Sequence, residues 1–427
     1  MKRQPLFACA AALLWALSGC TDTAGPQSAQ GGSSGSGGTA IGGGAAGSSP
    51  AGAGGGAAGS LSGAAGVSGA AGVSGAAGMS GSASGGALGS AGASTAGASG
   101  GGGTAGAAGV GGTAGSGTGP ASCQAGGPGV SDCGDGTESC CKSVKVAGGS
   151  FSRTYANDGS GAMNKADTAT ISDLLLDKYL VTVGRYRKFV AAWAGGSGYT
   201  PPVGSGKHAH LNGGKGLADS TTAGAYETGW QESNNDDLSP TNDNLACKSD
   251  SASWTNSAGA NEKLPINCVD WFEAYAFCIW DGGFLPSEAE FSYAAAGGDE
   301  QREYPWGSMD PGKSNQYAVY GCNYPDGSGT CTGLANISPV GTAKLGAGRW
   351  GHLDLAGNLT EWNLDWYGAT LGNPCADCAN LTKASGRVIR GGTFSSGLPE
   401  LVVPYRSSPN YPTNRTHTFG FRCARAP

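Results

Sequence analysis

The sequence lacks charged and aromatic residues over a long N-terminal stretch. No Asp, Glu, Lys or Arg occurs between Thr23 and Ser131, and no Phe, Trp or Tyr between Trp15 and Phe151. Gly, Ala, Ser and Thr fill this interval, and such a composition cannot bury enough apolar surface to fold. We therefore expect a disordered stalk over residues 20–121, with a root-mean-square reach of about 50–60 Å for a Gly-rich coil.

Apolar runs long enough to span a bilayer are also missing. The run Leu6–Leu17 follows a basic N-terminus, is too short to cross a membrane and ends in Leu17-Ser-Gly-Cys20. This pattern is typical of a lipoprotein signal peptide over residues 1–19, with a lipid attached to Cys20, and the alternative is an ordinary secretory signal. Thr21, in place of Asp, resembles bacterial lipoproteins of the outer membrane. We expect an exported protein held in the cell envelope by a lipid anchor.

Several functional classes find no support in the composition. The net charge is −6 and no basic stripe occurs, which argues against nucleic acid as a partner. Residues 307–314 match a phosphate-loop string, but no strand precedes them and Pro311 removes a backbone donor, so we expect no nucleotide binding. No G-x-S-x-G or H-E-x-x-H hydrolase motif is present. His208 and His210 could chelate a metal, but their Gly- and Lys-containing loop predicts a surface segment instead.

Cysteine is plentiful, with 14 residues. Without Cys9 in the signal peptide and Cys20 at the anchor, an even number remains, and disulfides are the usual state of such cysteines in an exported chain. A Cys-rich segment, residues 122–144, precedes the main domain. Its four cysteines predict cross-links whose pairing the sequence leaves open, with zinc as the alternative: Cys123, Cys133, Cys140 and Cys141.

The remaining residues, 145–427, predict one domain with few regular elements. Residues 169–176 are expected to form a strand. Three helices are expected, the first after Thr182, the second after Asp270 and the third after Ser287. Glu273 completes a capping box for the second helix, and an equivalent Glu follows Ser287 by three residues. Long Gly-, Asn-, Ser- and Asp-rich segments between the helices carry few strand or helix signals.

The segment Gly351-His-Leu-Asp-Leu-Ala-Gly-Asn-Leu-Thr-Glu-Trp-Asn-Leu-Asp-Trp-Tyr367 combines two carboxylates with a tight turn. Gly357 and Asn358 tolerate positive φ, so Asp354, Glu361 and main-chain carbonyls can converge. Hard oxygen ligands arranged in this way suit Ca²⁺. The alternative is a polar turn between two buried segments, anchored by the aromatic residues that follow.

Four other segments, together with this one, indicate a family. They are Phe284-Leu-Pro-Ser-Glu-Ala-Glu-Phe291, Tyr304-Pro-Trp-Gly307, Arg390-Gly-Gly-Thr-Phe394 and Gly420-Phe-Arg-Cys423. In this order and spacing the chain resembles the formylglycine-generating enzyme, or sulfatase-modifying factor, family from about Lys145 onward. The resemblance implies an α+β, C-type-lectin-like fold that is poor in regular structure, rich in disulfides and stabilised by calcium.

The resemblance also implies site residues. Calcium would be bound by the side chains of Asp354 and Glu361 and by the carbonyls of Gly357 and Leu359, with an additional site near Asn315. It implies a disulfide between Cys278 and Cys423. Nearness in the sequence adds three further expected pairs, Cys322–Cys331, Cys375–Cys378 and Cys247–Cys268.

One departure from the family bears on function. The family's oxidase binds copper(I) through two cysteines that follow the Arg-Gly-Gly motif. Here no Cys occurs from Ala379 to Arg422, and Ser395 or Ser396 cannot replace a soft thiolate, so no copper is expected. The favoured hypothesis is a non-oxidase binding module for an unknown envelope or extracellular ligand, a peptide or a glycan. The alternatives are an oxidoreductase with a different metal centre and a true formylglycine-generating oxidase.

Overall fold

The computed structural model describes residues 119–247 and 250–427, so Cys20, the expected signal peptide and all of the expected stalk except residues 119–121 lie outside the described part. No helix in the described part is long and apolar enough to cross a membrane. The α-helices are α1 (Val183–Trp193), α2 (Asn242–Leu245), α3 (Trp271–Trp280) and α4 (Glu288–Ala296). Short 3₁₀ turns are Ala121–Cys123, Ala194–Gly196, Asn212–Gly214, Glu232–Asp237, Ala260–Lys263, Gly298–Glu300, Leu334–Asn336, Lys344–Gly346 and Leu398–Glu400.

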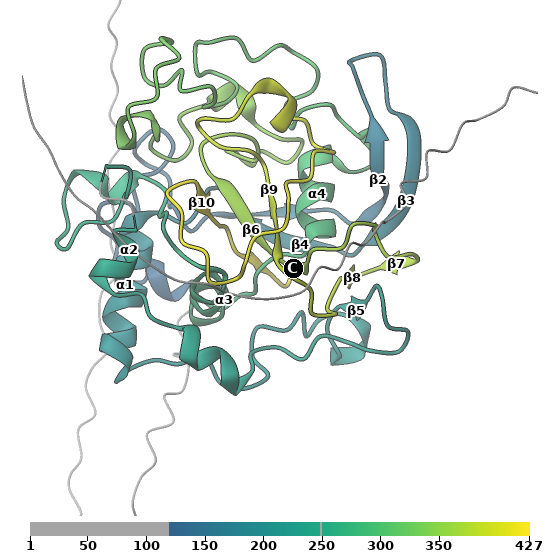
Figure 1. Ribbon diagram of the computed structural model, residues 1–427, viewed down its shortest axis with the longest axis horizontal. Coiled ribbons are helices and arrows are strands. Elements are labelled where there is room, and N and C mark those ends of the chain that lie inside the picture. The colour runs from purple at the N-terminus through teal and green to yellow at the C-terminus, as the bar shows by residue number, and fades with distance from the viewer. Residues whose placement is uncertain (1–118, 248–249) are drawn as a thin grey trace, which may run out of the picture. The chain divides into compact units, whose positions relative to one another are not determined.

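The strands form small sheets rather than one large sheet. They are β1 (Ser143–Val146), β2 (Gly149–Ala156), β3 (Met163–Ile171), β4 (Leu174–Asp177), β5 (Ala218–Asp219), β6 (Thr360–Trp366), β7 (Cys375–Ala376), β8 (Cys378–Ala379), β9 (Arg387–Arg390), β10 (Phe419–Gly420) and β11 (Ala424–Arg425). The strand orders are β1-β4-β11, β10-β6-β9, β2-β3-β7 and β5-β8. Figure 1 shows β6, β9 and β10 near the middle, with the β2–β3 hairpin at one side.

The three expected helices begin at the expected caps. The side chain of Thr182 accepts the N–H of Arg185, and Asp270 and Ser287 each form a capping box with the Glu three residues later. These boxes satisfy backbone donors that a helix N-terminus otherwise leaves free. Gly297 ends α4 in the left-handed conformation, with φ +67°. Local signals therefore place these helix ends correctly.

The single strand expected over residues 169–176 is instead two strands. β3 ends at Ile171 and β4 begins at Leu174, and the two belong to different sheets. Between them, Asp377 accepts the N–H and the hydroxyl of Ser172, both at 2.7 Å. The carboxylate oxygens of Asp377 take the place of the backbone hydrogen bonds that a neighbouring strand would form with Ser172. The chain therefore turns here from one sheet into the other.

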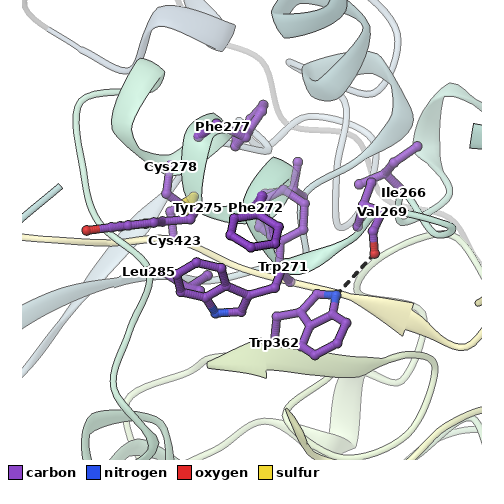
Figure 2. Close-up of a cluster of buried hydrophobic side chains, with 14 of the residues drawn as sticks. Ile266, Val269, Trp271, Phe272, Tyr275, Phe277, Cys278, Leu285, Trp362 and Cys423 are labelled. Carbon is purple, nitrogen blue, oxygen red and sulfur yellow. Dashed lines mark hydrogen bonds between the residues drawn. A yellow bond between two sulfur atoms is a disulfide. The ribbon is translucent and has the colours of Figure 1, made fainter. Parts of the chain in front are cut away.

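The main core packs around α3, which is almost entirely buried. Figure 2 shows Trp271, Phe277 and Trp362 in this core, where the indole N–H of Trp362 donates to the carbonyl of Val269 at 3.1 Å. The core also contains the Cys278–Cys423 disulfide, which joins α3 to the C-terminal segment. The fold is thus α+β, poor in regular elements and cross-linked, as expected.

All twelve cysteines in the described part form disulfides. Four of the pairs are those expected from the sequence, Cys278–Cys423, Cys322–Cys331, Cys375–Cys378 and Cys247–Cys268. The other two lie in the Cys-rich segment, Cys123–Cys141 and Cys133–Cys140. This segment does not stand apart from the domain, because Arg185 of α1 donates to the hydroxyl of Ser122 and to the carbonyl of Cys140.

Candidate functional site

The expected turn before β6 has the backbone that its sequence predicts. Gly357 and Asn358 have φ values of +86° and +63°, and Asp354 also lies in the left-handed region. A Cβ on residue 357 would sit 2.4 Å from the carbonyl oxygen of Val319, so only glycine fits. The N–H of Gly357 donates to the carbonyl of Gly391, which ties the turn to the Arg390-Gly-Gly loop.

The two carboxylates of this segment are buried beside Arg422. Glu361 accepts Nε and Nη2 of Arg422 through separate oxygens, both at 2.7 Å, while Asp354 accepts the N–H of Gly341 at 2.6 Å. Burial raises the pKa of Asp354 to about 6, although the Gly341 N–H and Arg422 oppose the rise. Burial also raises the pKa of Glu361, with Asp354 adding to the rise and Arg422 opposing it. Arg422 was not predicted from the sequence as the partner of Glu361.

These residues fit a hard cation. Two buried carboxylates face one guanidinium, so the cluster has one unbalanced negative charge, and Ca²⁺ prefers carboxylate and carbonyl oxygens. Each oxygen of Glu361 keeps a lone pair beyond the one that accepts from Arg422, so Glu361 could be shared. In the described part, no group of three or more His, Cys, Asp or Glu side chains is placed to hold a metal ion. A calcium ion here would therefore need the carbonyls of Gly357 and Leu359.

Asn315, expected near an additional calcium site, has different surroundings. It lines a cavity of about 460 Å³ with Lys344, Tyr324 and Thr342, and no carboxylate is among the lining residues. Its Nδ2 donates to the carbonyl of Asn323 at 3.0 Å, while its Oδ1 is buried without a partner. The lining of this cavity offers Ca²⁺ no carboxylate, and the additional calcium site near Asn315 stays a prediction.

The loop after β9 holds hydroxyl groups at the positions where the resemblance would require thiols. The hydroxyl of Ser396 donates to the carboxylate of Glu400 and accepts the N–H of Thr393 at 3.0 Å. Ser395 donates its N–H to the hydroxyl of Thr393 at 3.1 Å. These groups hold the loop by hydrogen bonds. Since every described cysteine is in a disulfide, the described part supplies no thiolate to this loop.

The expectation that His208 lies in a surface loop is wrong. Its side chain is fully buried, with Nδ1 3.0 Å from Glu227 and Nε2 3.1 Å from Glu290. Burial by itself lowers the pKa of His208, but Glu290 and Glu227 outweigh it and raise the pKa to about 10. No local pattern predicts this contact, because the two carboxylates lie 19 and 82 positions from His208 in the sequence. The imidazolium links the irregular segment before α3 to the N-terminus of α4.

Glu227, which contacts His208, also lines a pocket that was not predicted from the sequence. Its volume is about 680 Å³, and its walls come from α3, β6, β9 and the loops before and after them. Arg387 lies between the rings of Trp271 and Trp366, at 3.6 and 3.7 Å from the ring centres, and burial lowers its pKa to about 9. No local motif predicts this pocket, because its residues come together only when the sheet and α3 pack.

Comparisons with known proteins support the sequence resemblance. A model of the family described as sulfatase-modifying factor enzyme 1-like domain matches residues 132–427. The formylglycine-generating enzyme of Streptomyces coelicolor is 33% identical over 186 residues, which are 40% of this chain and 58% of that enzyme. The inactive C-alpha-formylglycine-generating enzyme 2 of Bos taurus is 33% identical over 175 residues, 39% of this chain and 52% of that protein. The chain thus matches little more than half the length of either relative.

Among solved structures, PvdO from Pseudomonas aeruginosa aligns with a TM-score of 0.44 at 23% sequence identity. The alignment covers 71% of this chain and all of the PvdO chain.

Proposed function

Because the chain belongs to the family of sulfatase-modifying factor enzyme 1-like domains, we propose that it is a non-oxidase binding module on that fold. The observation that carries the proposal is the state of the cysteines. All twelve in the described part are in disulfides, and residues 379–422 contain none. A copper(I) centre of two thiolates cannot assemble from serine hydroxyls. The pocket beside Trp271 and Arg387 supports a binding role.

We expect no aldehyde when the full chain is incubated with copper and a peptide that carries the Cys-x-Pro-x-Arg signal. The reason is the lack of a thiol pair in the loop after β9. Mass spectrometry of the peptide measures the product, and the Streptomyces coelicolor relative serves as the positive control. Copper bound one-to-one together with aldehyde would contradict the proposal. Aldehyde that persists in a Ser395→Ala, Ser396→Ala variant would point to an oxidoreductase with another centre.

We propose further that the module is displayed from a membrane by a lipid on Cys20 and the stalk of residues 20–121. The Cys20→Ser variant should lose membrane partition or accumulate as an uncleaved precursor, because the sulfur carries the lipid. Cell fractionation and intact-mass measurement of the mature chain check this result. A Cys9→Ser variant is the matched control and should be processed normally. Unchanged partition of Cys20→Ser would contradict the anchor.

Ca²⁺ is proposed to stabilise the turn before β6. Saturating Ca²⁺ should raise the melting temperature relative to a chelator, because an ion that binds only the folded state adds about 2.7 kcal/mol at one hundred times its Kd. Glu361→Gln and Asp354→Ala should each remove most of that gain, whereas Asp326→Ala, at an exposed turn, should keep it. Superimposable wild-type melting curves with chelator and with excess Ca²⁺ would leave the segment as a plain turn.

A further inference from the structure

Two of the residues that line the pocket beside α3 each have a buried polar atom without a hydrogen-bond partner. Oε1 of Glu227 and Nε of Arg387 form no hydrogen bond with any described residue, and both residues line the pocket. The two residues are 5% and 8% exposed, so bulk water solvates neither group well. Burying a polar group without a hydrogen bond is costly, and such groups commonly mark a place where a ligand bonds.

Arg387 differs from two other buried arginines, Arg185 and Arg422, in its charge balance. Arg185 lies 2.9 and 2.6 Å from the carboxylates of Asp177 and Asp281, and Arg422 lies 2.7 Å from Glu361. No described carboxylate forms an ion pair with Arg387, whose Nη1 donates to the carbonyl of Leu364 at 2.6 Å. Its guanidinium lies against the two indole rings, whose cation–π contacts hold it in place but supply no negatively charged partner.

The opposite charges of Glu227 and Arg387 determine which kind of ligand fits the pocket. An anion would bond Arg387 but be repelled by Glu227, and a cation would do the reverse. A hydroxyl group both donates and accepts, so neighbouring hydroxyls on one neutral ligand can satisfy the carboxylate oxygen and the guanidinium N–H together. The remaining polar lining is also mixed, with Asp237 and Lys383 among the residues. A neutral ligand with many hydroxyls therefore fits better than an ion.

The apolar part of the wall suits a ring with an apolar face. Trp271, Phe272, Tyr275 and Trp366 line the pocket, and flat aromatic surfaces bury C–H groups at little cost in side-chain entropy. The volume of about 680 Å³ lies within the range of small-ligand sites. Pyranose rings combine such an apolar face with hydroxyls at their edges.

A peptide is less suited because the strands at the pocket already have both edges bonded. β6 lies between β10 and β9, and β9 is bridged at Arg387 to Asn410. β5 pairs with β8 and is bridged to Tyr226. An extended peptide binds most readily by adding a strand to a free edge, and these segments present none.

We infer that this pocket binds the end of a neutral oligosaccharide, with Glu227 and Arg387 bonding neighbouring hydroxyls and Trp366 contacting a sugar ring. This assignment rests on the proposed binding function and names its ligand class. The pocket residues come from α3, β6, β9 and the loop that contains Glu227, so the site forms only in the folded domain.

The test is isothermal titration calorimetry of the full chain with neutral tetrasaccharides of glucose, mannose, galactose and N-acetylglucosamine. At least one should bind with a Kd below about 1 mM. Trp366→Leu, which removes the ring surface, and Glu227→Gln, which converts the free acceptor into a donor, should each weaken binding about tenfold. Trp306→Leu is the matched control, because Trp306 belongs to a different cluster of side chains, and it should bind as the wild type does.

Melting temperatures of the variants show whether a loss of binding comes from a loss of folding. If Trp366→Leu does not fold, Glu227→Gln alone tests whether the pocket binds the oligosaccharide. The assignment is overturned if no tetrasaccharide binds at about 10 mM, or if both variants bind as tightly as the wild type. Binding of an unstructured peptide that Trp366→Leu abolishes would also overturn it, while leaving the binding module intact. Aldehyde formation, in contrast, would overturn the proposed function and not the ligand class.

Discussion

Arg422→Ala should lower the free energy of unfolding by about 3–5 kcal/mol, because it leaves the carboxylate of Glu361 buried without its partner. Arg422 is fully buried, and it also donates to the carbonyls of Asp177, Leu353 and Asp354 at 3.0–3.1 Å. One side chain thus joins the turn before β6 to the end of β4. Urea titration of the full chain at 25 °C in chelator measures the change without a contribution from calcium.

Two further variants identify the cause of this loss. Arg349→Ala is the control, because Arg349 pairs with Asp299 and Glu300 at the surface, where such pairs contribute about 0–1 kcal/mol. Combining Arg422→Met with Glu361→Leu should recover part of the stability, since an apolar pair of similar volume leaves no buried charge. A loss below about 1 kcal/mol for Arg422→Ala would show that Glu361 does not depend on this guanidinium.

Removing the Cys278–Cys423 disulfide should have the largest effect of any cross-link. The two residues are 145 positions apart, and the chain-entropy relation for a loop of that length predicts a loss of about 5 kcal/mol. A Cys278→Ala, Cys423→Ala variant tests this by urea titration under non-reducing conditions. Both sulfurs are also fully buried in the core around α3, so the substitution leaves small cavities that add to the loss.

The matched control is the double variant Cys375→Ala, Cys378→Ala. Only three positions separate these cysteines, for which the same relation predicts about 2 kcal/mol. Equal losses for the two double variants would mean that loop closure in the unfolded chain does not set the contribution of the long disulfide. Full retention of stability in the Cys278 variant would show that the core alone holds the C-terminal segment.

Much of the domain's local structure could be predicted from short-range signals. The caps at Thr182, Asp270 and Ser287 set the starts of three helices, because the side chain and the backbone donor that it satisfies lie within three residues. The left-handed turn at Gly357 and Asn358 was predictable for the same reason, since only certain residues tolerate positive φ. The family was predictable from five short motifs in order.

Other features depended on residues far apart in the chain. A single strand over residues 169–176 was the wrong prediction because Asp377, more than two hundred positions away, bonds Ser172 and breaks the strand. The prediction that His208 lies in a surface loop was wrong because its carboxylate partners, Glu227 and Glu290, come from other elements. Composition reports how polar a loop is, but it does not report what packs over it.

The sequence by itself determined the family, the helix caps, the tight turn and the lack of thiols in the loop after β9, since each is a property of adjacent residues. Tertiary structure alone decided which charges meet. It paired Glu361 with Arg422, buried His208 between two carboxylates, and placed the unpaired Arg387 between Trp271 and Trp366. The physical reason is that the pairing and desolvation of a charge depend on its neighbours in space, and in this protein most of those neighbours are distant in sequence.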